Sequence, residues 1–264
     1  MASKNSWGTA IRKIVLDESR RANVGHIGSS LSVADILGAL YARVLRIPSP
    51  AHPERDRFVL SKGHAALALY AALVLRGFLE PEILCTYCGD DTHLGVHPER
   101  GLPGVDFATG SLGMGASFAT GAALAAKLDG SGRRVFALLS DAELNEGVVW
   151  EAAMFAAHHR LDNLVFILDL NGQQAFGYTK DVIDLAPVAA WRAFGWDVLE
   201  HDGHDEPGLA DALLGFDFAG GRPHVLAATT VFGKGVSFME RQIKWHYWPL
   251  SEEEHRQALA EIGA

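Results

Sequence analysis

The chain has 264 residues, of which 48% are hydrophobic and 21% are charged. This composition allows one domain with a full apolar core and excludes a disordered or collagen-like chain. The formal net charge of −9 argues against nonspecific nucleic-acid binding, which needs a basic face. The apolar runs are too short for a membrane span, and the first residues lack the apolar segment of a secretion signal. We therefore expect a single cytoplasmic domain over residues 1–264, with neither nucleic acid nor membrane as a partner.

Helix and strand patterns alternate along the chain, which favours an α/β fold with a mostly parallel sheet and helices on both faces. The predicted helices are Lys4–Ala22, Val33–Leu45, His64–Arg76, Gly113–Leu128, Asn145–His159, Pro187–Phe194, Glu206–Phe216 and a closing helix through Ile262. The predicted strands are Arg57–Leu60, Val135–Leu139, Leu164–Leu168, Trp196–Leu199 and His224–Thr229.

Two helix starts and two loops stand out in this pattern. Ser32 is placed to cap the helix that follows it, and Ser251 with Glu254 forms a capping box for the closing helix. The connection from Cys88 to Leu112 is too long to be idle in a compact domain. The Thr230–Gly235 loop follows a strand, and ligands of parallel sheets bind at the carboxyl ends of the strands.

Cys85 and Cys88 are the two cysteines, and His93 and His97 follow them. A zinc site must be considered, but zinc modules usually have a longer spacer between the cysteine pair and the histidine pair. A redox C-x-x-C motif usually opens a helix after a strand, whereas Leu79–Cys88 is predicted to be a helix that runs into a loop. We expect two reduced thiols, with one or both of them buried.

The strongest chemical signal lies in Ser140–Gly147 and Asp169–Gly172. A divalent cation prefers oxygen ligands from a carboxylate, an amide and a backbone carbonyl, which Asp141, Asn171 and the carbonyl of Gln173 could supply. This ligand set permits magnesium or calcium. The turn into the following helix could offer backbone N–H groups to a diphosphate. The two segments therefore predict a metal and diphosphate site at the carboxyl edge of the sheet.

Six motifs, in the same order along the chain, resemble those of the diphosphate-binding half of transketolase in the form encoded as a separate subunit. They are Gly25–Ser32, Leu60–Ala65, Gly95–Glu99, Thr109–Gly115, the metal motif above, and Phe232–Met239 with Trp245–His246. The resemblance implies a thiamine diphosphate enzyme that moves a two-carbon ketol unit from a ketose to an aldose, with sugars or sugar phosphates as substrates. Ordinary side chains cannot stabilise an acyl carbanion, so the cofactor supplies the electron sink.

The resemblance also implies roles for particular residues. Metal ligands would be Asp141, Asn171 and Gln173, and cofactor contacts would come from His64, Ser111, Leu112, Gly113, Asp141, Ala142, Glu143, Asn171 and His246. Glu143 is expected to be exposed, as an acid at a helix start. By resemblance, His26, His97 and His246 line the substrate channel, while His64 and His246 contact the diphosphate or nearby substrate oxygens. Histidine suits this work because its pKa lies near neutrality.

The resemblance also implies a role for one carboxylate, whereas five histidines have no assigned role. Glu146 resembles a family carboxylate that meets a glutamate of the partner chain, and we count it with the catalytic set. Five further histidines have no motif behind them: His158, His159, His201, His204 and His224.

The chain departs from the family pattern at several positions. Ser140 and Ala142 stand where the metal turn usually has two glycines, and alanine would cost on the order of 1 kcal/mol there if the turn needs a positive φ. Compared with the residues that the family usually has, the side chain is larger or chemically different at six positions, which are Gln173, Phe176, Met114, Val96, Phe232 and Tyr247. The pocket could be reshaped for a less usual substrate, or these could be neutral changes, and the sequence leaves both open.

No segment resembles the family's second domain, which holds the aminopyrimidine ring and its activating glutamate. We therefore expect a chain that is inactive alone and pairs with a pyrimidine-binding partner chain, as a heterotetramer with two copies of each chain. The α subunit of a 2-oxo acid dehydrogenase is an alternative, but it lacks the histidine patterns at Gly25–His26 and Lys62–His64. Another thiamine diphosphate synthase that forms C–C bonds, or a degenerate non-catalytic subunit, stays open.

Overall fold

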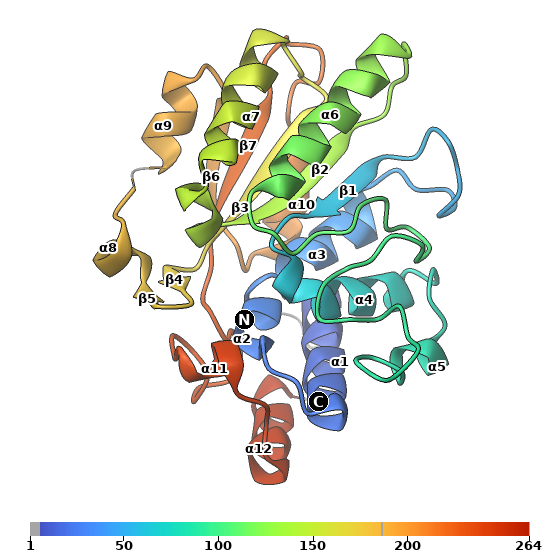
Figure 1. Ribbon diagram of the computed structural model, residues 1–264, viewed down its shortest axis with the longest axis vertical. Helices are drawn as coiled ribbons and strands as arrows, with labels where there is room; N and C mark the ends of the chain where they lie inside the picture. The colour runs from blue at the N-terminus through green and yellow to red at the C-terminus, as the bar shows by residue number, and fades with distance from the viewer. Residues whose placement is uncertain (1–5, 186, 264) are drawn as a thin grey trace.

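A five-stranded sheet, in the order β1-β2-β3-β7-β6, forms the centre of the computed structural model, which describes residues 6–185 and 187–263 (Figure 1). Every neighbouring pair of strands is parallel. The strands are β1 (Arg57–Leu60), β2 (Val135–Ser140), β3 (Leu164–Leu170), β6 (Asp197–Asp202) and β7 (His224–Thr229). A short hairpin of β4 (Gln173–Gln174) and β5 (Gly177–Tyr178) follows β3. The predicted α/β fold with a parallel sheet is confirmed.

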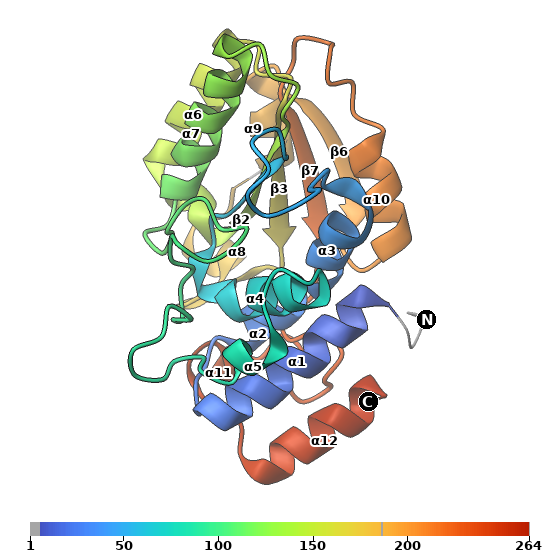
Figure 2. The same ribbon diagram turned by 90° about the vertical axis from the view of Figure 1, so that its right-hand side faces the viewer.

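Helices cover both faces of this sheet, as Figure 2 shows with α6 and α7 on one side and α3 and α10 on the other. Successive residues of β2 enter opposite apolar clusters, with Ala137 in the cluster under α6, α7 and α9 and Leu138 in the other. The helices are α1 (Trp7–Ala22), α2 (Ile27–Ser32), α3 (Ala34–Ala39), α4 (Ala66–Leu75), α5 (Pro81–Leu84), α6 (Met114–Leu128), α7 (Gly147–His158), α8 (Thr179–Val182), α9 (Pro187–Ala193), α10 (Glu206–Leu214), α11 (Lys244–Tyr247) and α12 (Glu252–Ile262). Shorter helical segments are η1 (Leu40–Val44), η2 (Gly63–Ala65) and η3 (Ala142–Asn145).

The second predicted helix, Val33–Leu45, is present as α3 followed without a gap by the π-helical turn η1. The helix α2, which ends at Ser32 directly before this range, was not predicted. Ser32 is not a cap, since its hydroxyl donates to the carbonyl of Ser29 and to the carboxylate of Asp169. Every residue from 27 to 41 is buried, so no alternation of polar and apolar faces marks where α2 ends and α3 begins.

The ends of the other predicted helices lie close to the positions expected from the sequence. The capping box of Ser251 and Glu254 is confirmed at the start of α12. Lys4, where the first helix was predicted to begin, lies outside the described residues, and α1 begins at Trp7 behind the cap Ser6. The other predicted helices and strands are present, with ends that match the prediction or differ from it by at most three residues. No helix in the described part of the chain is long and apolar enough to cross a membrane.

The segment around the two cysteines differs from the expectation. The helix α5 covers four residues only, and the chain turns at Cys88, which has a φ of 55°. Cys85 is exposed and Cys88 half-buried, so the expectation of a buried thiol is wrong, although both thiols are free. Among residues 6–185 and 187–263, no cluster of three or more His, Cys, Asp or Glu side chains is placed to hold a metal ion.

Candidate active site at the carboxyl edge of the sheet

The central strands end level with one another. Ser140 at the end of β2 pairs with Asp169 of β3, and Leu170 pairs with Thr229 at the end of β7. Because parallel strands share one direction, the segments that follow them meet at one edge. This edge faces α2, α4 and α11, toward which the strand arrows point in Figure 2. The polar residues predicted from the sequence lie at this edge.

The three predicted metal ligands lie together. One carboxylate oxygen of Asp141 accepts the N–H of Ala142 at 2.8 Å, and the other accepts the N–H of Gly172 at 2.6 Å. The side-chain oxygen of Asn171 accepts the N–H of Gln173 at 2.9 Å. The carboxylate therefore lies against the turn that carries the amide and the predicted carbonyl ligand.

The electrostatics of this turn fit a cation. Burial, reinforced by the nearby Asp169, raises the pKa of Asp141 to about 7. A buried carboxylate in this condition gains from a positive charge beside it, and a carboxylate, an amide and a carbonyl oxygen are ligands of hard divalent cations. The buried side-chain oxygen of Gln173 also has no hydrogen-bond partner among the described residues. The residues present therefore fit a bound metal.

Asp169 holds these segments in place. Its carboxylate forms an ion pair with Lys62, and both side chains are fully buried. It also accepts hydrogen bonds from Ser32 at 2.9 Å, from the amide nitrogen of Asn171 at 2.8 Å, and from the hydroxyl of Thr230. The bond to Asn171 fixes the amide, so that its nitrogen faces Asp169 and its oxygen faces the N–H of Gln173. Lys62 and Asp169 had no role among the sequence predictions, although charged residues at the ends of apolar strands were a usable signal.

Glu143 is buried, so the prediction that it is exposed is wrong. Its carboxylate accepts the N–H of Gly113 at 2.6 Å, the N–H of Ser140 at 3.2 Å, and the hydroxyl of Ser61. Burial raises the pKa of Glu143. Both of its side-chain oxygens bind protein groups, so the side chain connects the loops after β1 and β2 to the start of α6.

The turn after β2 does not need glycine. Ser140 and Ala142 are absent from the residues with positive φ, and Ala142 begins the 3-10 segment η3. The cost considered for alanine in this turn therefore does not arise. The helix predicted to start at Asn145 begins two residues later, at Gly147, and the exposed Glu146 occupies its N-cap position without a capping bond from its side chain.

Three of the predicted histidines form a cluster beside this edge. The ring centroids of His26 and His64 are 5.7 Å apart, those of His26 and His246 are 5.3 Å apart, and those of His64 and His246 are 5.5 Å apart. His26 has a φ of 60°, and its N–H donates to the carbonyl of His246 at 3.2 Å. His97 lies next to the cluster, with Gly110 packed closely against its ring.

These rings favour the neutral form. Burial lowers the pKa of His97, and burial together with His97 lowers the pKa of His26. Burial and the charge of Lys62 hold the pKa of His64 well below its usual value. Burial, followed by His26 and Lys62, lowers the pKa of His246 to about 4. Neutral imidazole has one donor and one acceptor nitrogen, so these rings can both give and take a hydrogen bond.

A cavity of about 90 Å³ joins the metal turn to the histidines. Its lining contains the predicted residues His64, Leu112, Ala142, Asn171, Gln173 and His246, with Ser29, Lys62, Ser140, Gln174, Ala175 and Phe232 in addition. The predicted residues outside this lining are His26, His97, Ser111, Gly113, Asp141, Glu143 and Glu146.

Exposed aromatic side chains follow the lining residues Ala175 and His246 in the chain. The exposed fraction of the residue is 88% for Phe176, 55% for Tyr247 and 62% for Trp248. The Tyr247 hydroxyl donates to the carbonyl of Ala175 at 2.9 Å, which connects α11 to the β4–β5 hairpin. Phe232, in the lining of the cavity, stacks on His246 with the ring centroids 6.1 Å apart and the planes at 18°.

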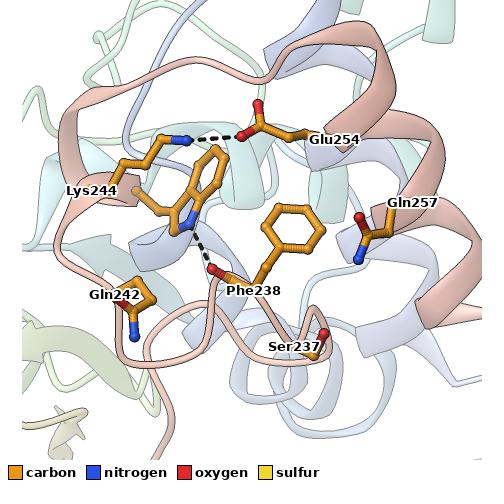
Figure 3. A pocket seen from close by; sticks show the side chains of 7 residues that line it. Ser237, Phe238, Gln242, Lys244, Glu254 and Gln257 are labelled. Carbon is orange, nitrogen blue, oxygen red and sulfur yellow. Dashed lines mark hydrogen bonds and ion pairs between the residues drawn. The ribbon is translucent and has the colours of Figure 1, made fainter.

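A second hollow lies between the loop after β7 and α12 (Figure 3). Lys244 bonds Glu254 at 2.8 Å across it, and the indole N–H of Trp245 donates to the carbonyl of Phe238 at 3.0 Å. These bonds hold α12 against the loop. Because the groups are already paired with one another, the hollow offers few free polar groups to a ligand.

The sequence matches the family model described as "Transketolase, thiamine diphosphate binding domain" over residues 3–264. This match covers nearly the whole chain, so the chain belongs to the transketolase family and carries its thiamine diphosphate-binding domain.

Similar proteins agree with this assignment. The chain is 43% identical to the 6-deoxy-6-sulfo-D-fructose transketolase subunit SqwG of Clostridium sp., over 96% of this chain and 93% of that protein. It is 39% identical to an apulose-4-phosphate transketolase subunit of Phocaeicola vulgatus, over 96% of this chain and 91% of that protein. Among solved structures, the transketolase of Campylobacter jejuni superposes with a TM-score of 0.91 at 32% identity, covering 98% of this chain and 42% of that chain. This chain thus spans less than half the length of that transketolase.

Proposed function

We propose that this chain is the diphosphate-binding subunit of a two-chain transketolase, which transfers a two-carbon ketol unit from a ketose to an aldose. The observation that carries the proposal is the joining of the Asp141–Asn171 turn and the His64–His246 pair in one cavity. Relatives named as transketolase subunits support a two-chain enzyme. A single domain over residues 1–264 and a cytoplasmic location belong to the same proposal.

Asp141, Asn171 and the carbonyl of Gln173 would hold magnesium or calcium, and the diphosphate of the cofactor would lie on this metal. Thiamine diphosphate, when bound, supplies the electron sink that side chains lack. Lys62 lines the cavity and carries a positive charge next to this turn, although Asp169 already binds its ammonium group. The Ser111–Gly113 loop would support the thiamine ring, and Glu143 would fix the position of that loop.

The histidines would handle the hydroxyl groups of the sugar. His26, His64, His97 and His246 have lowered pKa values, so each is neutral at pH 7 and can accept a hydrogen bond from a sugar hydroxyl or donate one to it. The one buried nitrogen in this group without a partner among the described residues is Nδ1 of His26. A substrate hydroxyl could satisfy it.

The partner chain would complete the site. The cavity of about 90 Å³ is much smaller than the roughly 300–1,000 Å³ of ordinary ligand pockets. Exposed aromatic side chains, such as Phe176 and Tyr247 beside the lining residues Ala175 and His246, are typical of surfaces that another chain covers. Glu146 is exposed next to Gly113, where a partner carboxyl group could meet it. Two copies of each chain would form the assembly.

The substrate would be a ketose of a specialised pathway that carries a sulfonate or phosphate group. The names of the two relatives, which specify a sulfonated sugar and a sugar phosphate, support this class. Phe232 and Tyr247 add aromatic surface where the family pattern has a lysine and a glycine. Lys62, the one lysine or arginine among the residues that line the cavity, is paired with Asp169, so the cation that binds the sulfonate or phosphate would come from the partner.

The test uses the chain together with a pyrimidine-binding partner, sought in the neighbouring reading frame. We expect no ketol transfer by either chain alone, transfer by the mixture, and calorimetric binding of thiamine diphosphate that requires magnesium or calcium. Full activity of this chain alone would refute the two-chain proposal. No binding, or binding that Asp141→Ala leaves unchanged, would indicate a degenerate subunit. Turnover of a 2-oxo acid with loss of carbon dioxide would indicate a synthase.

The donor is identified with a panel of sulfonated, phosphorylated and plain ketoses, tested on the wild type and on Tyr247→Gly. We expect a change in the ranking of donors in the variant. Equal rankings together with a preference for ordinary sugar phosphates would show that the aromatic substitutions do not select the substrate.

A further inference from the structure

His204 lies in the turn between β6 and α10, and no sequence motif surrounds it. In the structure its Nε2 accepts the N–H of Val231 at 2.8 Å, and its Nδ1 bonds the carboxylate of Asp35 at 2.8 Å. A backbone N–H can only donate, so Nε2 is the acceptor and the ring proton lies on Nδ1. The ring therefore forms a directed connection from Asp35 to Val231.

Asp35 is itself held firmly. Arg12 of α1 forms two parallel hydrogen bonds to its carboxylate, at 2.9 and 2.5 Å, and both side chains are buried. Burial by itself would raise the pKa of Asp35, but the bonds from His204 and Arg12 hold it below its usual value. A bidentate ion pair of this kind fixes geometry in addition to charge. His204 is thus anchored to the two helices α1 and α3.

Val231 leads directly into the cavity wall. The next residue, Phe232, lines the cavity and stacks on His246. Its ring lies so close to Gly28 that a Cβ on Gly28 would be 2.1 Å from it, and the N–H of Gly233 donates to the carbonyl of Gly28 at 2.9 Å. The loop is therefore fixed on one side by α2 and on the other by the bond from Val231 to His204.

We propose that His204, oriented by Asp35, is a positioning residue of the candidate active site: it holds Val231 so that Phe232 is seated against His246. The expected effect on cofactor binding rests on the proposed function, whereas the effect on the position of Phe232 does not. Without the acceptor nitrogen, the N–H of Val231 would lose its partner in a half-buried position. The loop would then turn to find another acceptor, and the wall formed by Phe232 and His246 would move.

The first test compares His204→Leu, His204→Gln and His201→Leu in the complex with the partner chain. Glutamine can present an acceptor and a donor in place of the two ring nitrogens, whereas leucine presents neither. His201 lies three residues away, and its ring bonds only the carbonyl of Asp202, so it is the matched control. Isothermal titration with thiamine diphosphate and magnesium gives the dissociation constant and the number of sites.

We expect the dissociation constant to rise about tenfold in His204→Leu with the number of sites unchanged. His204→Gln should recover most of this loss, and His201→Leu should match the wild type. A fall in the number of sites at an unchanged dissociation constant would mean that part of the protein is misfolded, which would overturn the inference. Equal dissociation constants in wild type and His204→Leu would also overturn it.

The second test uses the isolated chain and needs no cofactor. Nitrogen-15 NMR should show the His204 ring protonated on Nδ1, and the amide signals of residues 231–235 and the ring signals of His246 should shift in His204→Leu but not in His201→Leu. Unchanged signals in His204→Leu would refute the positioning role. Failure of the wild-type complex to bind thiamine diphosphate would count against the proposed function instead, and the NMR result would still decide the role of His204.

Discussion

The two halves of the candidate site are built in different ways. The half at the strand ends is built around Asp141, Asn171 and Asp169. The side-chain oxygens of Asp141 and Asn171 accept hydrogen bonds from backbone N–H groups, and the carboxylate of Asp169 accepts one from the amide nitrogen of Asn171. The half formed by the histidines and aromatic residues comes from loops and short helices. There His26 keeps a buried nitrogen without a partner among the described residues, and Tyr247 is more than half exposed.

This difference indicates a division of work. Side chains placed by a buried sheet cannot move far, which suits a ligand whose position must be fixed, such as a metal with a diphosphate. Side chains placed by loops can change without disturbing the core, which suits a substrate that differs from one relative to another. Changes at the strand ends should therefore abolish cofactor binding, while changes in the aromatic wall should alter which sugar is used.

The largest expected effect is the loss of the metal ligand in Asp141→Ala. Thiamine diphosphate with magnesium at 100 times its dissociation constant should stabilise the wild-type complex by about 2.7 kcal/mol. The variant should bind about a hundredfold more weakly or worse, and so show almost no stabilisation. Thermal unfolding with and without both ligands measures this. Asp181→Ala, an exposed acid in α8, is the control and should behave as the wild type. Equal stabilisation of the Asp141 variant would show that the strand ends do not hold the metal.

The next effect concerns the rigidity of the same half. Gly113 has a φ of 86°, and a Cβ there would lie 2.5 Å from the side chain of Val148. Gly113→Ala should lower the free energy of unfolding by about 1–3 kcal/mol. Gly121→Ala in the same helix, where a Cβ meets nothing within 4 Å, should raise it by about 0.5–1 kcal/mol. Urea unfolding of the two variants and the wild type measures these changes. Equal unfolding midpoints for the two variants would argue against a strained start of α6.

The sequence was sufficient for most of the sheet. The strands β1 and β7 were predicted to the residue, because each is a short apolar run with polar residues or turns at its ends. The helix α2 and the change to π-helical geometry at Leu40 were not predicted, since residues buried on all sides carry no periodic signal for where one helix ends and the next begins.

In the site, too, features set by neighbouring residues were predictable, whereas contacts between residues far apart in the chain were not. The order of the motifs identified Asp141, Asn171 and the histidines as candidates. Local rules made Glu143 an exposed acid, because its partners Gly113 and Ser61 are 30 and 82 residues away in the chain. The ion pair of Lys62 and Asp169 spans 107 residues and depends on the strand order, which composition and spacing do not reveal.

The histidine half should respond to pH. The pKa of His246 is about 4 in the folded chain against an ordinary value of 6.5, so the neutral ring favours folding above pH 6.5, and this stability is lost as pH falls toward 4. In His246→Asn this contribution is absent. Between pH 7 and 4.5 the wild type should therefore lose about 1–2 kcal/mol more unfolding free energy than the variant, allowing for solvent screening. Urea midpoints at both pH values test this, with the exposed His158→Asn as control. Parallel pH profiles for wild type and His246→Asn would contradict the lowered pKa.

The smallest effect should come from the rim of the cavity. Tyr247→Phe removes only the hydroxyl that donates to the carbonyl of Ala175, and at an exposed position this should cost less than about 1 kcal/mol of stability. We expect cofactor affinity to stay unchanged, while the ratio of kcat/KM between two ketose donors changes about two- to fivefold, because the hairpin that carries Ala175 is released from α11. Tyr178→Phe, whose hydroxyl bonds Arg241 instead, is the matched control and should keep the wild-type ratio. If Tyr247→Phe weakened cofactor binding and left the donor ratio as it was, the rim would belong to the cofactor half, and the division between a fixed half and a variable half would be wrong.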